Sequence, residues 1–394
     1  MWAVRFSAWI IRSAILTALA CFGTVASATT TRVAALGGAS DYFDDESNVQ
    51  RWYGNLPEQT DLALLEPGRL DLDAGHAAWD ERVLGEGGGL FLRLADGRNP
   101  STAAIFFSAD RPDSGSGGYI GGMAGRQFGA VAAAVSFVGT SHFAEERSLG
   151  RYTSRADYSH ELGLGLDFRC SDRFRLATAG EIVNTQYGGA ESTWESFGLR
   201  LRASWRPGDS WTLASLCDYW RDVRAAYSPL LASSGDCDAW QIRVGCGIVR
   251  EPTPQRRLLF SAEYREGKEG WAMLSFPTRF SNSERDYFVL HCRVGAEARV
   301  QPWLTLRFGA EYRRVEEACE RWRKFDWDAY SDQEVAGSVR VETPIALGCS
   351  VGSGDLTLDL MLADGTPSWA GYLRSENGLA DNGHYFGATL AYRY

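Results

Sequence analysis

The chain has 394 residues, of which 45% are apolar and 12% aromatic, and its formal net charge is −10. This acidic balance argues against a nucleic-acid-binding protein, because the phosphate backbone would repel the chain. After residue 28 no apolar run reaches the roughly 20 residues that a membrane-spanning helix needs. These features exclude a helical membrane protein and leave a strand-rich chain.

The N-terminus predicts export from the cytoplasm. A short basic region precedes a mostly apolar stretch at 13–25, and the small residues at 26–28 fit a cleavage site. A transmembrane anchor is the alternative, but the apolar run is short for it. We expect a signal peptide at 1–28, an N-terminal segment at 29–60 and a single large domain at 61–394.

Apolar and polar residues alternate over much of the chain from residue 156 onward. Leu304, Leu306 and Phe308 share one strand face, whereas Arg307 and Glu311 lie on the other. A helix would spread such residues around its circumference, so this two-residue period predicts strands. The same alternation recurs at 161–168, 197–205, 240–248, 258–265, 288–297 and 356–362.

The connections between these strands are expected to alternate in length. Short turns are predicted at 170–173, 207–209, 252–254, 301–302 and 352–355. Longer loops are predicted at 187–193, 223–236, 266–284, 314–333 and 364–384. Upstream, weaker strand candidates lie at 62–73, 87–96, 101–110, 117–125 and 127–139. The pattern predicts an all-β, transmembrane, antiparallel up-and-down β-barrel of about 14–16 strands, with short turns on the periplasmic side.

The last ten residues support the same fold. Phe386, Leu390 and Tyr394 fall on one face of a strand that ends in an aromatic residue. Such an ending is typical of bacterial outer-membrane barrels, whose apolar band faces lipid. We therefore expect an outer-membrane location, contact with outer-membrane lipid, and delivery to the barrel-assembly machinery through this C-terminal strand.

The polar faces of the predicted strands carry many charged residues. Arginine dominates over lysine, which occurs only at Lys268 and Lys324, and one guanidinium can bind several carboxylates. The predicted lumen-lining residues are Arg200, Arg202, Arg243, Glu263, Arg265, Arg293, Glu297, Arg307, Glu311, Arg313, Arg340 and Glu342. These residues either form a charged constriction that selects solutes or pair with one another and close the interior.

Other candidate sites have weaker patterns. Cys237 and Cys319 fall in two predicted loops at one end of the barrel, where a disulfide is an option in the oxidising envelope. The acidic clusters at 41–46 and 326–334 lack calcium-loop spacing, so solvated charge is favoured over a metal site. The G-x-S-x-G match at 348–352 ends a strand instead of opening a helix. We expect no catalytic residues, no metal and no cofactor.

Residues 33–57 resemble the N-terminal segment of FadL-type outer-membrane transporters. The matching positions are Gly37, Gly38, Asp44, Asp45 and Asn55, whereas Leu56-Pro57 departs from the Pro-Ala that follows the asparagine in that family. The resemblance implies that residues 29–60 form a hatch inside the lumen of a barrel that carries hydrophobic molecules. The alternative is a periplasmic extension that plugs nothing.

Three functions remain open from the sequence. The first is an outer-membrane channel or transporter for passive uptake of small solutes, hydrophobic ones if the resemblance holds. The second is a structural or adhesive barrel with a closed lumen. The third is an outer-membrane hydrolase, for which scattered histidines offer no diagnostic spacing.

Overall fold

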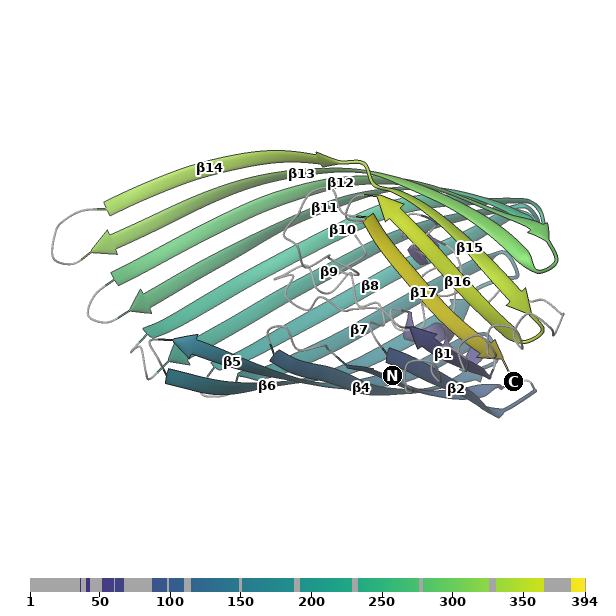
Figure 1. Ribbon diagram of the computed structural model, residues 1–394, viewed down its shortest axis with the longest axis horizontal. Helices are drawn as coiled ribbons and strands as arrows, with labels where there is room; N and C mark the ends of the chain where they lie inside the picture. The colour runs from purple at the N-terminus through teal and green to yellow at the C-terminus, as the bar shows by residue number, and fades with distance from the viewer. Residues whose placement is uncertain are drawn as a thin grey trace, which may run out of the picture.

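A computed structural model gives the structure of the protein at residues 36, 40–42, 52–59, 61–66, 87–97, 99–109, 115–148, 151–187, 192–228, 233–275, 279–325, 331–364 and 384–393. Almost all of these residues belong to strands of one sheet (Figure 1). The predicted signal peptide, Tyr394 and the hatch residues Gly37, Gly38, Asp44 and Asp45 lie outside the described residues.

The sheet closes on itself. Its first strands are β1 (Leu62–Glu66), β2 (Gly87–Ala95), β3 (Ser101–Ala109), β4 (Gly115–Phe128), β5 (Val131–Ser148), β6 (Arg151–Arg169), β7 (Phe174–Tyr187) and β8 (Ser192–Gly208). They are followed by β9 (Trp211–Ser228), β10 (Ser233–Thr253), β11 (Arg256–Ser275), β12 (Arg279–Gln301), β13 (Leu304–Phe325), β14 (Ser331–Glu342), β15 (Ile345–Ser353), β16 (Leu356–Asp364) and β17 (His384–Arg393). Antiparallel pairing of β1 with both β2 and β17 completes the ring.

The barrel has 16 strands, because β14 and β15 occupy one position in the ring. Both pair with β13, β14 along its second half and β15 along its first. Pro344 lies between them and has no N–H to donate to the ladder, although its carbonyl accepts the Glu311 N–H at 2.9 Å. The predicted class, a closed antiparallel up-and-down barrel of about 14–16 strands, is confirmed.

The predicted strand faces are confirmed as well. On β13, Leu306 is 46% exposed and Phe308 40%, whereas Thr305 and Arg307 between them are buried. The two-residue period therefore separates an apolar outer surface from a polar interior. Trp205, Trp211 and Trp303 are exposed next to the short turns, where an interfacial girdle of aromatic residues is expected.

The short turns that the structure describes lie at one end of the barrel. Two-residue turns at 129–130 and 354–355 begin with Gly129 and Gly354, whose φ values of 62° and 61° suit tight hairpins. The hairpin turn at 129–130 corrects the predicted strand 127–139, because residues 127 and 128 belong to β4. The C-terminal end of β17 and the start of β1 lie at this turn end, which is the periplasmic end in barrels of this type.

Three predicted long loops are wrong. Much of 223–236, 266–284 and 314–333 is strand, so that β12 has 23 residues and β13 has 22. About 9–11 residues suffice for a strand to cross a membrane. The remainder of β10–β14 projects beyond the short strands β15–β17 and β1–β3 (Figure 1). The part of a strand that lies beyond the membrane does not contact lipid, so its outward residues need not be apolar. The alternation by which strands are recognised in sequence is therefore lost in that part.

Among the residues that the structure describes, no helix combines the length and the apolar character needed to cross a membrane.

Arginine at Phe308 should destabilise the barrel by about 2–4 kcal/mol, because this exposed position lies midway between Leu304 and Tyr312, the two ends of the outward apolar row on β13. Reversible urea unfolding in lipid vesicles would measure the change. Ala318→Arg is the matched control, since Ala318 lies on the same face of β13 but six residues past Tyr312, beyond the band. Equal losses at both positions would contradict the assigned membrane boundary.

Candidate functional site

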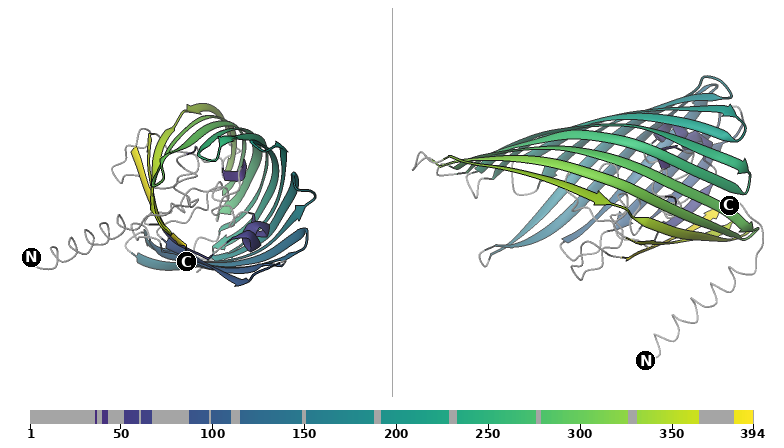
Figure 2. Two further views of the ribbon diagram at one scale, coloured as in Figure 1. Left: turned by 90° about the vertical axis from the view of Figure 1, so that its right-hand side faces the viewer. Right: turned by 90° about the horizontal axis from the view of Figure 1, so that it is seen from above.

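Two short helical turns lie inside the ring of strands (Figure 2, left). They are η1 (Ser40–Tyr42) and η3 (Tyr53–Glu58), and both belong to the N-terminal segment, residues 29–60. Leu36, Tyr42, Trp52, Tyr53 and Leu56 are each at most 1% exposed. The described part of this segment is therefore packed against the inner face of the wall.

Tyr53 is seated against β6 by two glycines of the wall. An added Cβ at Gly163 would lie 2.3 Å from the Tyr53 ring, and one at Gly165 would lie 2.6 Å from the Tyr53 Cβ. The Tyr53 hydroxyl lies 2.5 Å from Glu181 Oε2 and 3.1 Å from Glu161 Oε1. Burial raises the pKa of this hydroxyl, and Glu181 raises it further, so the phenol keeps its proton and donates it.

Asn55 and Glu58 extend this contact toward the turn end. Arg175 Nη2 donates to Asn55 Oδ1 at 3.2 Å and lies 2.9 Å from Glu58 Oε1. Arg175 also binds Asp167 of β6 at 2.7 Å. One guanidinium on β7 thus joins the N-terminal segment to the wall, as the planar fork of arginine allows.

Tyr42 packs in the same way against two glycines of β10. Below, each position where a tyrosine of the N-terminal segment packs against a pair of wall glycines is called a seat, and the space left by the glycines is called a hollow. A Cβ at Gly247 would lie 2.4 Å from the Tyr42 ring, and one at Gly245 would lie 2.1 Å from its hydroxyl oxygen. The hydroxyl donates to Glu263 Oε1 at 3.0 Å. Burial raises the pKa of the Tyr42 hydroxyl, and the nearby Glu263 carboxylate raises it further.

Asp41 is bound by three side chains. Arg243 Nη2 donates to Asp41 Oδ2 at 3.1 Å and also binds Asp218 on β9. Trp52 Nε1 donates to Asp41 Oδ1 at 3.0 Å. Arg202 lies 5.0 Å from the centre of the Trp52 ring and donates to the Asp41 carbonyl at 3.4 Å. Because Arg243 is only 2% exposed, this ion pair is shielded from water.

The wall beside η3 is apolar. Trp52, Tyr53 and Leu56 join a buried cluster with inward side chains of β1–β5, β7 and β17. Its large members from the wall are Leu62, Leu64, Phe91, Phe106, Met123 and Val138. The inner surface is thus apolar on β1–β5 and charged on β7–β13, and the N-terminal segment contacts both regions.

Two further polar clusters join wall residues. His291 Nδ1 lies 2.8 Å from Arg293 Nη2, which can only donate, so Nε2 carries the proton and donates to Glu311 Oε2 at 2.7 Å. Closer to the turn end, Arg307 on β13 binds Glu297 on β12 at 2.7 Å and Asp359 on β16 at 2.9 Å.

The Ser350 hydroxyl donates to Asp359. It therefore belongs to the Arg307 cluster and is not placed beside a histidine base, as a nucleophile would require.

No protein-family model matches the sequence, and no curated protein matches it either. Among solved structures, the translocator domain of the autotransporter NalP from Neisseria meningitidis is 12% identical, with a TM-score of 0.35 over 68% of this chain and 90% of that one. CdiB from Escherichia coli is 13% identical, with a TM-score of 0.46 over 86% of this chain and 63% of that one. The deltaS2 mutant of the TodX monoaromatic hydrocarbon channel is 10% identical, with a TM-score of 0.44 over 93% of this chain and 98% of that one.

The barrel itself decides the location. Its ring is closed, its outer band is apolar and its interior is charged, an arrangement that satisfies every backbone group within lipid. The protein is a bacterial outer-membrane β-barrel.

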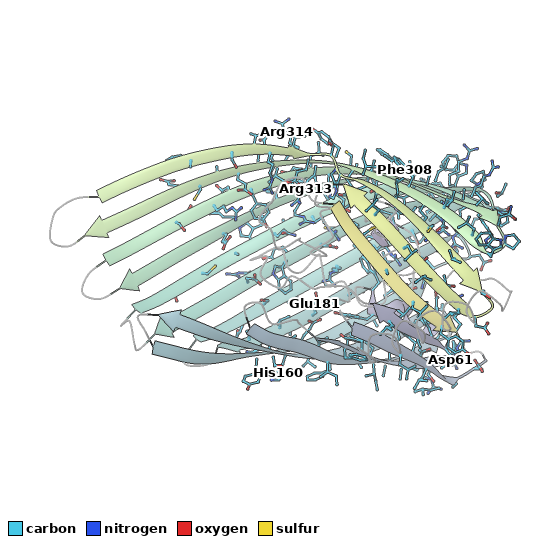
Figure 3. The ribbon with its side chains drawn as sticks, in the orientation of Figure 1. Asp61, His160, Glu181, Phe308, Arg313 and Arg314 are labelled. Carbon is cyan, nitrogen blue, oxygen red and sulfur yellow. The ribbon has the colours of Figure 1, made fainter. Side chains whose placement is uncertain are left out.

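The predicted lumen-lining residues of this outer-membrane barrel occupy different surroundings. Arg200, Arg202, Arg243, Glu263, Arg293, Arg307 and Glu311 are buried on the inner face. Arg265, Glu297, Arg313 and Glu342 are half-buried. Arg313 lies 3.5 Å from Glu342, whereas its neighbour Arg314 faces outward (Figure 3). Arg340 shares the inner face of β14 with Glu342, but its side chain is 62% exposed.

Sequence reasoning missed the side chains of the N-terminal segment that contact the wall, and it missed Asp218 on the wall. Tyr42, Trp52 and Tyr53 carry no charge and belong to no motif, and Asp218 lies among alternating polar residues. One signal was present in the sequence. Gly163 and Gly165, like Gly245 and Gly247, are paired inward glycines that leave hollows in the wall.

The disulfide that the sequence left open between Cys237 and Cys319 is not formed. Cys237 and Cys319 lie on β10 and β13 and not in loops, and two strands separate them. Three interstrand spacings amount to about 14 Å, whereas a disulfide needs Cα atoms within about 7 Å.

The acidic cluster at 326–334 falls largely outside the described residues, as does the part of the first cluster at 43–46.

Proposed function

We propose that the protein is a passive channel or transporter for small solutes, closed at rest by its N-terminal segment at 29–60. The seating of Tyr42 and Tyr53 in hollows left by wall glycines carries this proposal. A periplasmic extension would have no need of such hollows. A permanently closed barrel would fill them with wall side chains, since protein interiors are close-packed.

The contacts of the segment suit reversible closure. Asp41 and Glu58 bind wall arginines, and Tyr42 and Tyr53 donate to wall carboxylates. Each contact can be replaced by water once the segment moves, so no covalent link has to break. Hydrated carboxylates and guanidiniums would then line the passage and select solutes by charge and size.

Small apolar solutes are the class we propose. Phe91, Phe106 and Met123 line the wall next to η3 and offer an apolar surface inside a charged lumen. The resemblance of residues 33–57 to the FadL-type segment favours the same class. The two alternatives, a structural barrel with a closed lumen and a hydrolase, remain as outcomes of the test below.

Deleting residues 29–60 should raise single-channel conductance in planar bilayers, because the segment would no longer occupy the lumen. The truncated protein should retain the heat-dependent mobility shift on electrophoresis that reports a closed barrel. Equal conductance of intact and truncated protein, at matched mobility shift, would rule out closure by this segment. Conductance absent from both would favour the structural barrel, and turnover of phospholipid or peptide would favour the hydrolase.

We also infer that β17 carries the signal for assembly. Its outward Tyr392 is exposed, and its inward Thr389 and Ala391 are buried, so the strand presents its outward face to lipid. β17 is the last strand in the chain, and its pairing with β1 closes the ring. Recognition by the barrel-assembly machinery through β17 follows from that position.

A further inference from the structure

Two outward arginines at the turn end of the barrel each lie over an aromatic ring. On β4, Arg126 lies 5.6 Å from the centre of the Phe128 ring. On β10, Arg250 lies 5.0 Å from the centre of the Trp211 ring, and Trp211 is its register partner on β9. All four side chains are exposed on the outer face. Phe128 and Trp211 directly adjoin the turns at 129–130 and 209–210, and Arg126 lies three residues before the first of these turns.

These arginines differ from the outward cations at the loop end. There, Arg221 lies 2.9 Å from Asp238, Lys268 lies 2.7 Å from Glu284, and Arg314 binds Glu316. Within the described part of the chain, Arg126 and Arg250 have an aromatic ring as partner and no carboxylate. These three loop-end cations are therefore compensated by carboxylates, whereas Arg126 and Arg250 at the turn end are not.

The aromatic ring fixes the orientation of each guanidinium. A cation–π contact uses no N–H hydrogen bond to a carboxylate, so the guanidinium N–H groups remain available to donate to an anion. A phosphate diester is the anion that such a planar fork binds in a bidentate manner. The exposed ring edges of Phe128 and Trp211 lie at the membrane boundary, where aromatic residues contact lipid headgroups.

We infer that Arg126 with Phe128 and Arg250 with Trp211 form two binding sites for the headgroup phosphate of anionic phospholipids in the periplasmic leaflet. Charge complementarity favours this occupant over a protein partner. The whole chain is acidic, with a net charge of −10, so an anionic lipid is drawn to these positions and not to the protein in general. Their function would be to hold the barrel at a fixed depth and to order lipid around the turn end.

The test uses the intact protein in vesicles of phosphatidylcholine mixed with phosphatidylglycerol, followed by extraction and native mass spectrometry of retained lipid. The wild-type protein should retain phosphatidylglycerol in excess of its share of the mixture. Arg126→Gln with Arg250→Gln should reduce this enrichment by roughly fivefold for each arginine removed. Arg221→Gln with Arg314→Gln is the matched control and should leave it unchanged, because those cations already bind carboxylates.

A second pair of variants tests the contribution of the rings. Phe128→Leu with Trp211→Leu keeps an apolar anchor but removes the stacking surface, so part of the enrichment should be lost with both arginines present. The mobility shift on heating shows which variants are folded. Undiminished enrichment in the folded Arg126→Gln, Arg250→Gln protein, or an equal loss in the control pair, would overturn the inference.

Discussion

Leucine at both Gly165 and Gly247 should open the channel while leaving the barrel folded. At Gly247 the nearest atoms to an added Cβ, at 2.4–2.7 Å, all belong to Tyr42. At Gly165 they belong to Tyr53 and Gly54, at 2.5–3.0 Å. Both leucines would therefore clash with the N-terminal segment and not with the wall, and the segment would leave its two seats. Single-channel conductance should rise most of the way to that of the protein lacking residues 29–60.

Gly122→Leu with Gly180→Leu provides the control for this experiment. An added Cβ at either position faces outward, and its nearest neighbour is a carbonyl oxygen at 3.7 or 3.8 Å. The control should keep the conductance of the wild-type protein, since leucine suits the lipid face. Wild-type conductance in a folded Gly165→Leu, Gly247→Leu variant would show that the seats do not hold the lumen closed.

Arg243→Met should lower the free energy of unfolding by about 3–5 kcal/mol, because it leaves buried carboxylates without their cation. Arg243 binds both Asp41 and Asp218, and its side chain is 2% exposed. Reversible denaturant unfolding in vesicles would measure the change. Adding Asp41→Asn should recover part of the loss, since one of the uncompensated charges is then removed.

Arg221→Met is the comparison for Arg243→Met. Arg221 lies on β9 and binds Asp238 of the neighbouring strand β10 at 2.9 Å. Unlike Arg243 and its partners, both of these side chains are more than half exposed. Exposed ion pairs contribute about 0–1 kcal/mol, so this change should be nearly silent. Similar losses at the two positions would mean that Arg243 is hydrated in the folded protein and that the segment is not sealed against the wall.

The membrane part of the barrel could be predicted from sequence alone. Within lipid each strand must place an apolar side chain outward at every second position, and only a closed ring of strands satisfies the backbone groups of a sheet. Leu306 and Phe308 therefore reveal their orientation directly, as do Thr305 and Arg307 between them. The same constraint fixes the class of fold and its location, because closure is the only way to remove free edges in lipid.

The strand ends beyond the membrane could not be predicted in this way. From Arg314 to Phe325 on β13, water or a charged interior borders the strand, so polar residues are tolerated at every position. A segment in which charged and apolar residues do not alternate is predicted to be a loop from sequence. In the structure it is a strand, because it pairs with β12 and β14 through backbone hydrogen bonds. Likewise Cys237 and Cys319 were placed near one another only because their strands were taken for loops.

The sequence by itself predicted the barrel and the two faces of its membrane strands, because these follow from a local period of two residues. Only the tertiary structure decided which inward charges meet and what occupies the hollows between them. Asp41 and Arg243 are bonded although they lie 202 residues apart in the sequence, and Tyr53 and Glu181 although they lie 128 residues apart. Such contacts depend on the curvature of the closed wall and on glycines several strands apart, and no local pattern in the chain records them.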